Sequence, residues 1–244
     1  MSNLKQYICF HNDGPARMNA RPKTQSQTRL VLEHLRPAIL SGRMLPGSKL
    51  NIAALAEDIG VSAGAVREGL ATLEAESLVQ SEPARGYRVS PVSAQELQQL
   101  VAARIEVECL CLAEAILHGD LAWEGGVVAA FHRLSRLPER QTERPTLVNP
   151  DWALAHAEFH RALVSGCPNL WLLRIHDMLY QQSERYRQLS APLDAGERNV
   201  QTEHKALMDA VLGRDLSLAR TLIDAHLQTT ARLILDSPQQ VWPS

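Results

Sequence analysis

Four histidines in the second half of this chain are spaced so that they could bind a single metal ion. His156 and His160 are one helical turn apart, so both rings can lie on the same face of a helix. His204 and His226 fall on two successive helical segments that reverse direction near Gly213. With a rise of about 1.5 Å per residue, they lie roughly 14 and 19 Å from that turn, at comparable heights. Imidazoles that converge from several helices can form a metal site inside a bundle.

The other residues able to bind metals show no comparable pattern. The four cysteines contain no C-x-x-C pair, which predicts free thiols in a cytosolic protein. An isolated histidine is more often a structural residue than a ligand. We therefore assign the remaining histidines to ordinary core or surface positions: His11, His34, His118, His132 and His176.

Residues 50–89 predict two helices joined by a tight turn, followed by a two-stranded hairpin. The first helix ends at Gly60, which readily adopts the positive φ of a helix terminus. Ser62 is placed to cap the second helix. The buried stripe of that helix has a spacing of 3.6 residues and consists of Val66, Leu70 and Leu73. This arrangement predicts a winged helix-turn-helix, and the alternative is a helical hairpin within a larger bundle.

The exposed N-terminal side of the second helix is expected to carry small residues and one arginine. Such a surface can approach the floor of a DNA major groove closely. The hairpin turns through residues 82–86, which places an arginine beside a glycine at its tip. The candidate DNA-binding residues are Ser62, Ala63, Gly64, Ala65, Arg67, Arg85 and Gly86.

Composition indicates a two-domain, mainly helical protein. A length of 244 residues with 45% hydrophobic content is enough for two cores, and only 5% of residues are aromatic. No run of about 18 apolar residues is present, and the N-terminus lacks the apolar segment of a signal peptide. We therefore expect a cytoplasmic protein with no membrane span.

Charge differs between the two halves. Residues 1–91 carry 11 Lys and Arg against 8 Asp and Glu, whereas the rest of the chain carries 14 against 19. A mildly basic first domain and an acidic second domain suit DNA binding by the first domain only.

The predicted fold class is mainly α, with an N-terminal winged helix-turn-helix and a C-terminal all-α antiparallel helical bundle. The expected segments are a disordered tail at 1–24, the DNA-binding domain at 25–91, the helical domain at 92–237 and a tail at 238–244. Ser93 and Glu96 form a capping box at the start of the bundle. Its helices are expected near 94–118, 121–137, from Pro150 to Gly166, 169–190, 197–212 and 216–235.

The first domain resembles the DNA-binding domain of the GntR family of bacterial transcription regulators. The resemblance is carried by I-L-S-G-R-M-L-P-G-S-K-L at 39–50, L-A-E-D-I-G-V-S-x-x-x-V-R-E at 55–68 and R-G-Y-R-V at 85–89. It implies that the second helix enters the major groove and the wing reaches the minor groove. Ala53 and Ala63 stand where many relatives carry arginine, and each guanine-reading arginine contributes about 1–3 kcal/mol of base discrimination.

The second domain resembles the all-helical FCD domain of the FadR-like branch of this family. The matching stretches are R-I-E-V-E at 104–108, H-A-E-F-H at 156–160, E-H at 203–204 and G-R-D-L-S-L-A-R-T-L-I-D-A-H-L at 213–227. At the positions that match the family motifs, the implied metal ligands are His156, His160, His204 and His226. Many FCD domains have an aspartate where this chain has His156. Four neutral nitrogen donors favour zinc or nickel over magnesium, calcium or manganese.

The resemblance also implies that Arg104, in the R-x-x-x-E stretch, anchors a carboxylate ligand. The alternative is a surface pair between Arg104 and Glu108, which are one helical turn apart. We expect the effector role, because apolar residues flank Arg104 and bury its helix.

These observations predict a homodimeric, ligand-responsive transcription regulator, more often a repressor in this family. Its expected partners are an inverted-repeat operator in double-stranded DNA and a small organic acid. A metal-sensing regulator is one alternative. A metal-dependent hydrolytic enzyme is another, but no carboxylate is placed as a general base, since Glu158 and Glu203 should point away from the metal.

Overall fold

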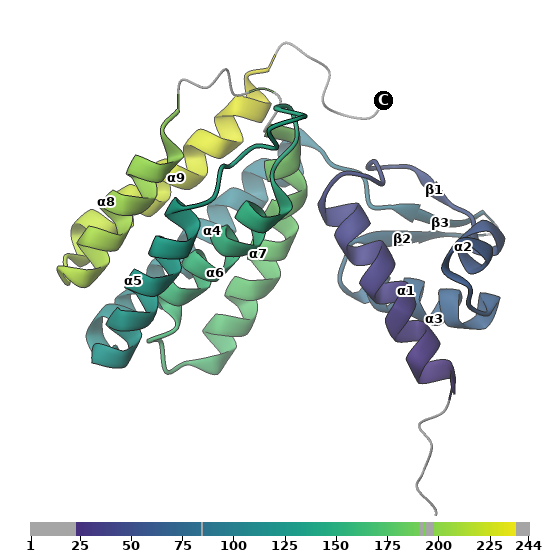
Figure 1. Ribbon diagram of the computed structural model, residues 1–244, viewed down its shortest axis with the longest axis horizontal. Helices are drawn as coiled ribbons and strands as arrows, with labels where there is room; N and C mark the ends of the chain where they lie inside the picture. Colours follow the sequence, from purple (N-terminus) through teal and green to yellow (C-terminus); the bar gives the residue numbers. More distant parts are fainter. Residues whose placement is uncertain (1–22, 84, 191–192, 194–197, 238–244) are drawn as a thin grey trace, which may run out of the picture.

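The computed structural model describes residues 23–83, 85–190, 193 and 198–237. They form two domains, each built around its own apolar core (Figure 1). The tails predicted at 1–24 and 238–244 lie outside the described residues, apart from 23 and 24, which begin the first helix. Within these described ranges, no helix is long and apolar enough to cross a membrane.

The first domain is a winged helix-turn-helix, as predicted. Its helices are α1 (Lys23–Leu40), α2 (Ile52–Ile59) and α3 (Ala63–Ala75), and its strands are β1 (Lys49–Leu50), β2 (Val79–Glu82) and β3 (Gly86–Val89). The antiparallel sheet has the order β1-β3-β2, so β3 is the central strand. The short strand β1 was not predicted, because two residues carry no periodicity.

Local backbone chemistry sets the turn between α2 and α3. Gly60 has a φ of 73°, and its N–H donates to the carbonyls of the last turn of α2. The Ser62 hydroxyl caps α3 by accepting a hydrogen bond from the Ala65 N–H at 3.2 Å. Both features were predicted from residue type and position.

The second domain is a helical bundle. It contains α4 (Ala94–His118), α5 (Leu121–Ser135), α6 (Pro150–Val164), α7 (Leu170–Ser190), α8 (Val200–Leu212) and α9 (Leu216–Leu235). Helix α4 packs against both α7 and α9, while α5 packs on α6 (Figure 1). The bounds of α4 and α9 agree with the prediction, whereas α8 begins three residues later than expected.

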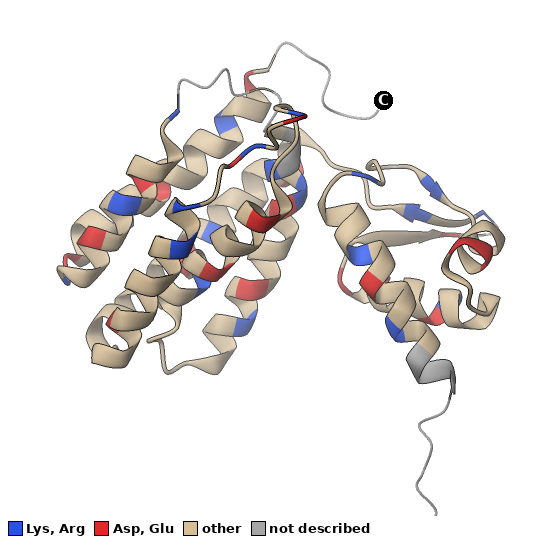
Figure 2. Cartoon of the chain, viewed as in Figure 1, with Lys and Arg blue, Asp and Glu red and all other residues tan. Residues whose placement is uncertain are grey.

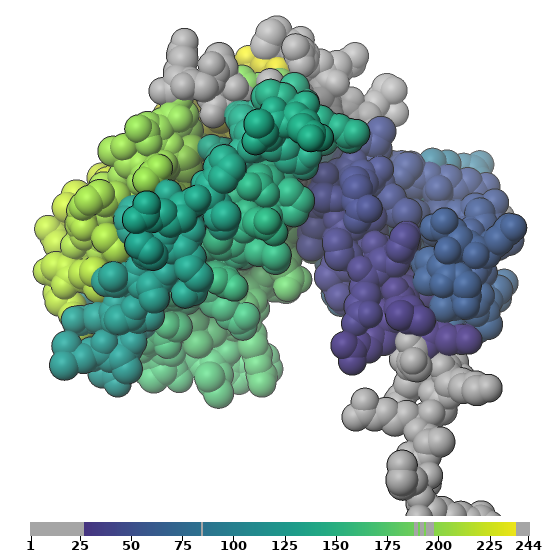
Figure 3. Space-filling model, in the orientation of Figure 1, coloured from purple at the N-terminus to yellow at the C-terminus, as the bar shows by residue number. Residues whose placement is uncertain are grey.

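Helix α7 also holds the junction between the two domains. The Arg185 guanidinium donates to the carbonyls of Ser90 and Pro91 in the linker. The Gln182 side chain donates to the Glu76 carbonyl at 2.6 Å, just after α3. Below this contact the two domains are separated by an open notch (Figure 3). The junction is therefore a localised contact made by one helix.

Gly69 allows α3 to cross α1 closely. A Cβ at this position would lie 2.5 Å from Cγ1 and 3.0 Å from Cβ of the buried Val31. A β-branched side chain has little freedom to move aside. We predict that Gly69→Ala lowers the free energy of unfolding by about 1–3 kcal/mol in a urea titration.

Gly64→Ala is the matched control on the same helix. A Cβ there meets only the Ser62 hydroxyl oxygen, at 3.8 Å. We expect this variant to be unchanged or stabilised by up to about 1 kcal/mol. Equal stability of the two variants would show that the α1–α3 crossing tolerates a larger residue.

Candidate metal centre and nucleic-acid interface

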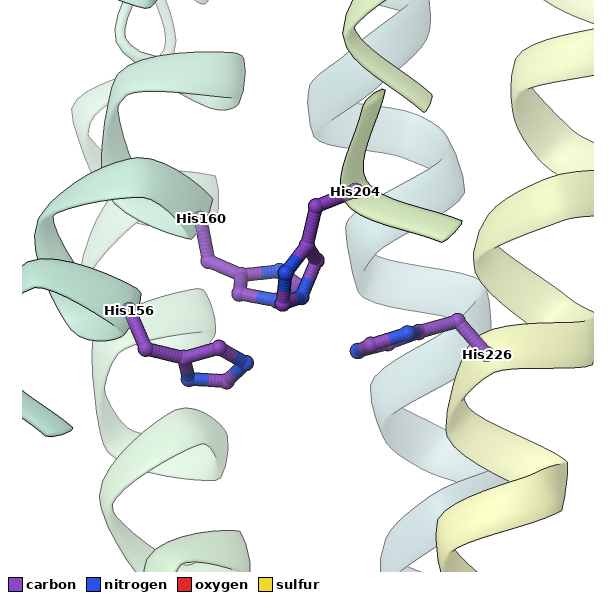
Figure 4. A group of neighbouring side chains, drawn as sticks. All are labelled: His156, His160, His204 and His226. Carbon is purple, nitrogen blue, oxygen red and sulfur yellow. The ribbon is translucent and has the colours of Figure 1, made fainter. Parts of the chain in front are cut away.

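The structure brings the four predicted histidines together in the bundle core. His156 and His160 extend from α6, His204 from α8 and His226 from α9, and their rings point toward one another (Figure 4). One nitrogen from each ring belongs to a set whose members all lie within 4.8 Å of one another. All four side chains are buried. Their grouping confirms the predicted geometry of the site, while the metal itself stays a prediction.

Neighbouring side chains fix the orientation of these rings. The Tyr180 hydroxyl lies 2.8 Å from His156 Nδ1. The Glu203 carboxylate lies 2.8 Å from His226 Nδ1. A partner on Nδ1 holds the ring and leaves the lone pair of Nε2 free to bind a metal ion, which is the usual arrangement around protein-bound metals.

The prediction that Glu203 points away from the site was wrong, although Glu158 does point away and contacts Arg133 on the surface. Glu203 precedes His204 on α8, but α9 packs alongside and brings His226 to its carboxylate. This neighbour is a product of helix packing. Spacing along α8 alone could not reveal it.

Glu108 and His176 are further polar residues of the site that the sequence analysis did not identify. Glu108 is buried, and its carboxylate lies 3.3 Å from His176 Nε2 and 3.5 Å from His160 Nδ1. Burial alone would raise the pKa of Glu108, but the Arg104 guanidinium and the two histidines hold it well below its ordinary value. Glu108 therefore remains a carboxylate beside His160.

Burial also keeps the imidazoles neutral. It lowers the pKa of His156 and His204 well below the ordinary value and lowers the pKa of His226 as well. The pKa of His160 falls to about 4, despite the opposing effect of Glu108. Neutral imidazole is the form that binds a metal ion. At neutral pH the cluster therefore offers four lone pairs.

The donor set fits a divalent transition metal. Among the described residues, neither ring nitrogen of His160 or His204 has a hydrogen-bond partner, although all four atoms are buried. A buried polar atom without a partner is costly, and a metal ion would satisfy one nitrogen of each ring. Zinc–nitrogen bonds are about 2.0–2.1 Å long. The ring nitrogens, which here lie up to 4.8 Å apart, would have to move slightly closer together to bind one zinc ion.

Arg104, on α4, lies beside the histidine cluster. Its side chain is 8% exposed, and its Nε lies 3.3 Å from the Glu108 carboxylate. Its guanidinium carbon also lies 4.8 Å from the centre of the Tyr180 ring. The alternative of a surface pair with Glu108 is therefore wrong in its location, since the pair exists but is buried.

Arg104 and two of the histidines line a cavity of about 60 Å³. His156 and His226 form part of its wall, together with Trp152 and several aliphatic side chains. Arg187 and Arg198 also line it. A compact anion in this cavity could contact the metal position and a guanidinium together.

Most candidate DNA-binding residues lie on the exposed surface of the first domain. Ser62, Ala63, Gly64 and Arg67 are exposed at the start of α3, and Arg85 and Gly86 are exposed at the wing. The prediction for Ala65 was wrong, because this residue is completely buried. Helix α3 packs against α1, and the Ser62 hydroxyl at its start donates to the Gln27 side chain of α1.

Lys49 is a further cation on this surface that the sequence analysis did not identify. It lies on β1, paired with Arg88 of β3, and lines a shallow depression together with Arg67 and Arg85. Basic residues on this sheet are visible in Figure 2. The depression places cations from α3, the wing and β1 on one face, as expected of a surface that contacts DNA phosphates.

Comparison with known families assigns both domains. A model described as bacterial regulatory proteins of the gntR family matches residues 27–89, and the FCD domain model matches residues 99–229. The chain belongs to the GntR family. It is a transcription regulator with an FCD domain, and not an enzyme.

Similar proteins share this two-domain organisation. The HTH-type regulator BphR of Paraburkholderia xenovorans LB400 is 40% identical over 84% of this chain and 83% of its own length. The repressor GlaR of Escherichia coli K12 is 33% identical over 82% of this chain and 92% of its own. A GntR regulator from Rhodococcus sp. RHA1 has a TM-score of 0.70 at 24% identity, covering 88% of this chain and 100% of its own. Escherichia coli McbR has a TM-score of 0.69 at 20% identity, covering 86% and 98%.

Arg67 is the one long cationic side chain on α3, and it is exposed. We predict that Arg67→Ala lowers operator affinity about 5- to 150-fold, which corresponds to about 1–3 kcal/mol, while leaving the fold intact. A mobility-shift titration measures this change. Arg43→Ala, in the turn after α1, is the control and should bind as the wild type does. Unchanged affinity of Arg67→Ala would remove this residue from the interface.

Proposed function

We propose that this GntR regulator is a homodimeric repressor controlled by a divalent transition metal and a small organic acid bound together in its FCD domain. The observation that supports this most strongly is the convergence of four buried, neutral imidazoles beside a cavity lined by Arg104. Metal and guanidinium are both recognition groups for a carboxylate.

The donor set supports zinc or nickel as the resident ion. Four imidazole nitrogens suit these ions better than magnesium or calcium, which prefer oxygen ligands. A six-coordinate ion held by four nitrogens keeps two positions for exchangeable ligands. A bidentate carboxylate or hydroxycarboxylate would satisfy both positions, and Arg104 would bind its other oxygens.

Repression is proposed by analogy with a relative, and dimerisation from the symmetry expected of the operator. The relative GlaR is a transcriptional repressor. One winged helix contacts only a few base pairs, which is too few for specificity in a genome. Two copies related by two-fold symmetry would recognise an inverted repeat.

A regulator that senses the metal itself is the second candidate. It is favoured by the burial of the cluster, since four protein nitrogens alone can complete a tetrahedral zinc site. In that case the metal alone would change operator affinity.

Glu203→Gln tests the metal site through a residue that does not bind the ion. Loss of the carboxylate next to His226 Nδ1 should weaken zinc or nickel affinity about 10- to 100-fold, because ring orientation and basicity both depend on that contact. Competition with a chromophoric chelator measures the affinity. Glu158→Gln, whose side chain contacts Arg133 on the surface, is the control. Equal metal affinity of the two variants would contradict the proposed site.

Operator binding with a panel of organic acids tests the full proposal. We expect at least one acid to change the operator affinity of the zinc- or nickel-loaded wild type, and His160→Ala and Arg104→Ala to abolish that response. Mobility-shift titrations on an inverted repeat measure affinity and give the number of chains per operator. A response to metal without acid would favour the metal sensor, and no response to either would reject both.

A further inference from the structure

The charged side chains around the cavity neutralise one another in pairs. Arg104 lies 3.3 Å from Glu108 on α4. Two further arginines that line the cavity are paired in the same way: Arg187 with Glu184 at 2.6 Å, and Arg198 with Glu203 at 2.6 Å. Glu139 and Arg140 also line the cavity, so four guanidinium groups are balanced by four carboxylates. A divalent ion held by four neutral imidazoles would therefore leave about two positive charges without protein counter-charges.

Arg187 has a hydrogen-bond donor that is not used by the protein. Its Nε and Nη2 donate to the two Glu184 oxygens at 2.9 and 2.6 Å. Within the described part of the chain, its buried Nη1 has no hydrogen-bond partner. A buried guanidinium donor that is left unpaired costs free energy, so a bound acceptor would be favoured.

The position of Arg187 relates it directly to the metal site. Its guanidinium carbon lies 5.3 Å from the centre of the Trp152 ring, and that ring stacks on His156 with 4.6 Å between ring centres. Both Arg187 and Arg104 line the same cavity. Arg104 Nε also makes no hydrogen bond to any described residue, although it lies 3.3 Å from the Glu108 carboxylate. Two buried guanidinium groups, each with a nitrogen that makes no hydrogen bond to a described residue, thus border the same cavity.

We propose that the effector is a compact dianion, and that Arg187 is the specificity-determining residue that binds its second acidic group. This inference rests on the proposed function, in which the metal and Arg104 bind the first carboxylate. Two negative charges match the charge of the ion that the protein leaves uncompensated. The second group satisfies Arg187 Nη1, which a monocarboxylate at the metal leaves without a partner.

The cavity limits the size of this ligand. Its volume of about 60 Å³ is small compared with the several hundred Å³ typical of pockets for drug-sized molecules. Aliphatic side chains form the wall between the polar groups, including Leu97, Val101 and Leu227. A short dicarboxylate, with a few methylene or hydroxymethylene groups between its acids, fits both the apolar wall and the two charged ends.

Calorimetric titration of the zinc-loaded full-length protein tests this inference. The probes are the C3 to C6 α,ω-dicarboxylates and their monomethyl esters, which keep the length but remove one charge. We expect the preferred dicarboxylate to bind at least about tenfold more tightly than its ester, the lower bound for a hydrogen bond to a charged group. Arg187→Gln should reduce that ratio to about one, while ester binding persists.

Control variants separate the possible results. Arg174→Gln, on the exposed side of the same helix, should retain the wild-type ratio. Arg187→Lys keeps the charge but cannot bind Glu184 and a ligand as a planar fork, so its ratio should also fall. It replaces the glutamine variant if that variant does not fold.

The outcomes also separate this inference from the proposed function. If wild type binds esters as tightly as dicarboxylates, or if the Arg187 variants keep the preference, the role of Arg187 is overturned while acid binding stands. If no acid binds the zinc-loaded wild type, the proposed function and this inference both fail.

Discussion

The organisation of the helical domain depends on the cost of burying polar side chains. Four imidazoles lie in the same core as Phe159 and Leu207, where an unpaired nitrogen would be unfavourable. The surrounding helices supply hydrogen-bond partners for two of the rings, a phenol from α7 for His156 and a carboxylate from α8 for His226, and place the Glu108 carboxylate of α4 3.5 Å from His160. The inner side of the cluster is left to a ligand. The bundle is thus closed around a polar centre in which a bound ion would pair one further nitrogen of each ring.

The guanidinium groups follow the same constraint. Arg104, Arg187 and Arg198 each have a carboxylate close by, so these parts of the wall are nearly neutral despite their charges. The pKa of Glu203 falls to about 2 although burial opposes this, because Arg198 and His226 donate to its carboxylate. Neighbouring arginines also lower the pKa of Glu108 and Glu184, so all three carboxylates stay ionised at physiological pH. Net attraction for an anion would therefore come from a bound ion and from the few unused donors.

Local signals in the sequence were sufficient to predict the helices and the hairpin, but not the short strand β1 or the contacts between elements. Gly60, Ser62 and Ser93 determine helix ends through their own backbone or side chain, and the structure has these ends where they were expected. The four histidines could be grouped because their helical spacing and their positions in the FCD motifs indicate the same site. Glu203 was misplaced because its partner His226 lies on a neighbouring helix, α9, and the burial of Ala65 is likewise a tertiary feature. The unused donor of Arg187 is also a tertiary feature, since it depends on how α7 is rotated.

Helix α7 connects the cavity with the DNA-binding domain. One side of it carries Tyr180 and Arg187 into the site, and another side carries Gln182 and Arg185 to the junction. Because these residues lie within two helical turns of a single rigid element, a rotation or shift that improves contacts in the cavity must also move the donors that hold the linker and the end of α3. A ligand can change the equilibrium between two such positions only through its different affinity for them. A ligand in the cavity would therefore act on the DNA-binding domain through its contacts with α7, and also through Arg104 on α4, which begins directly after the linker.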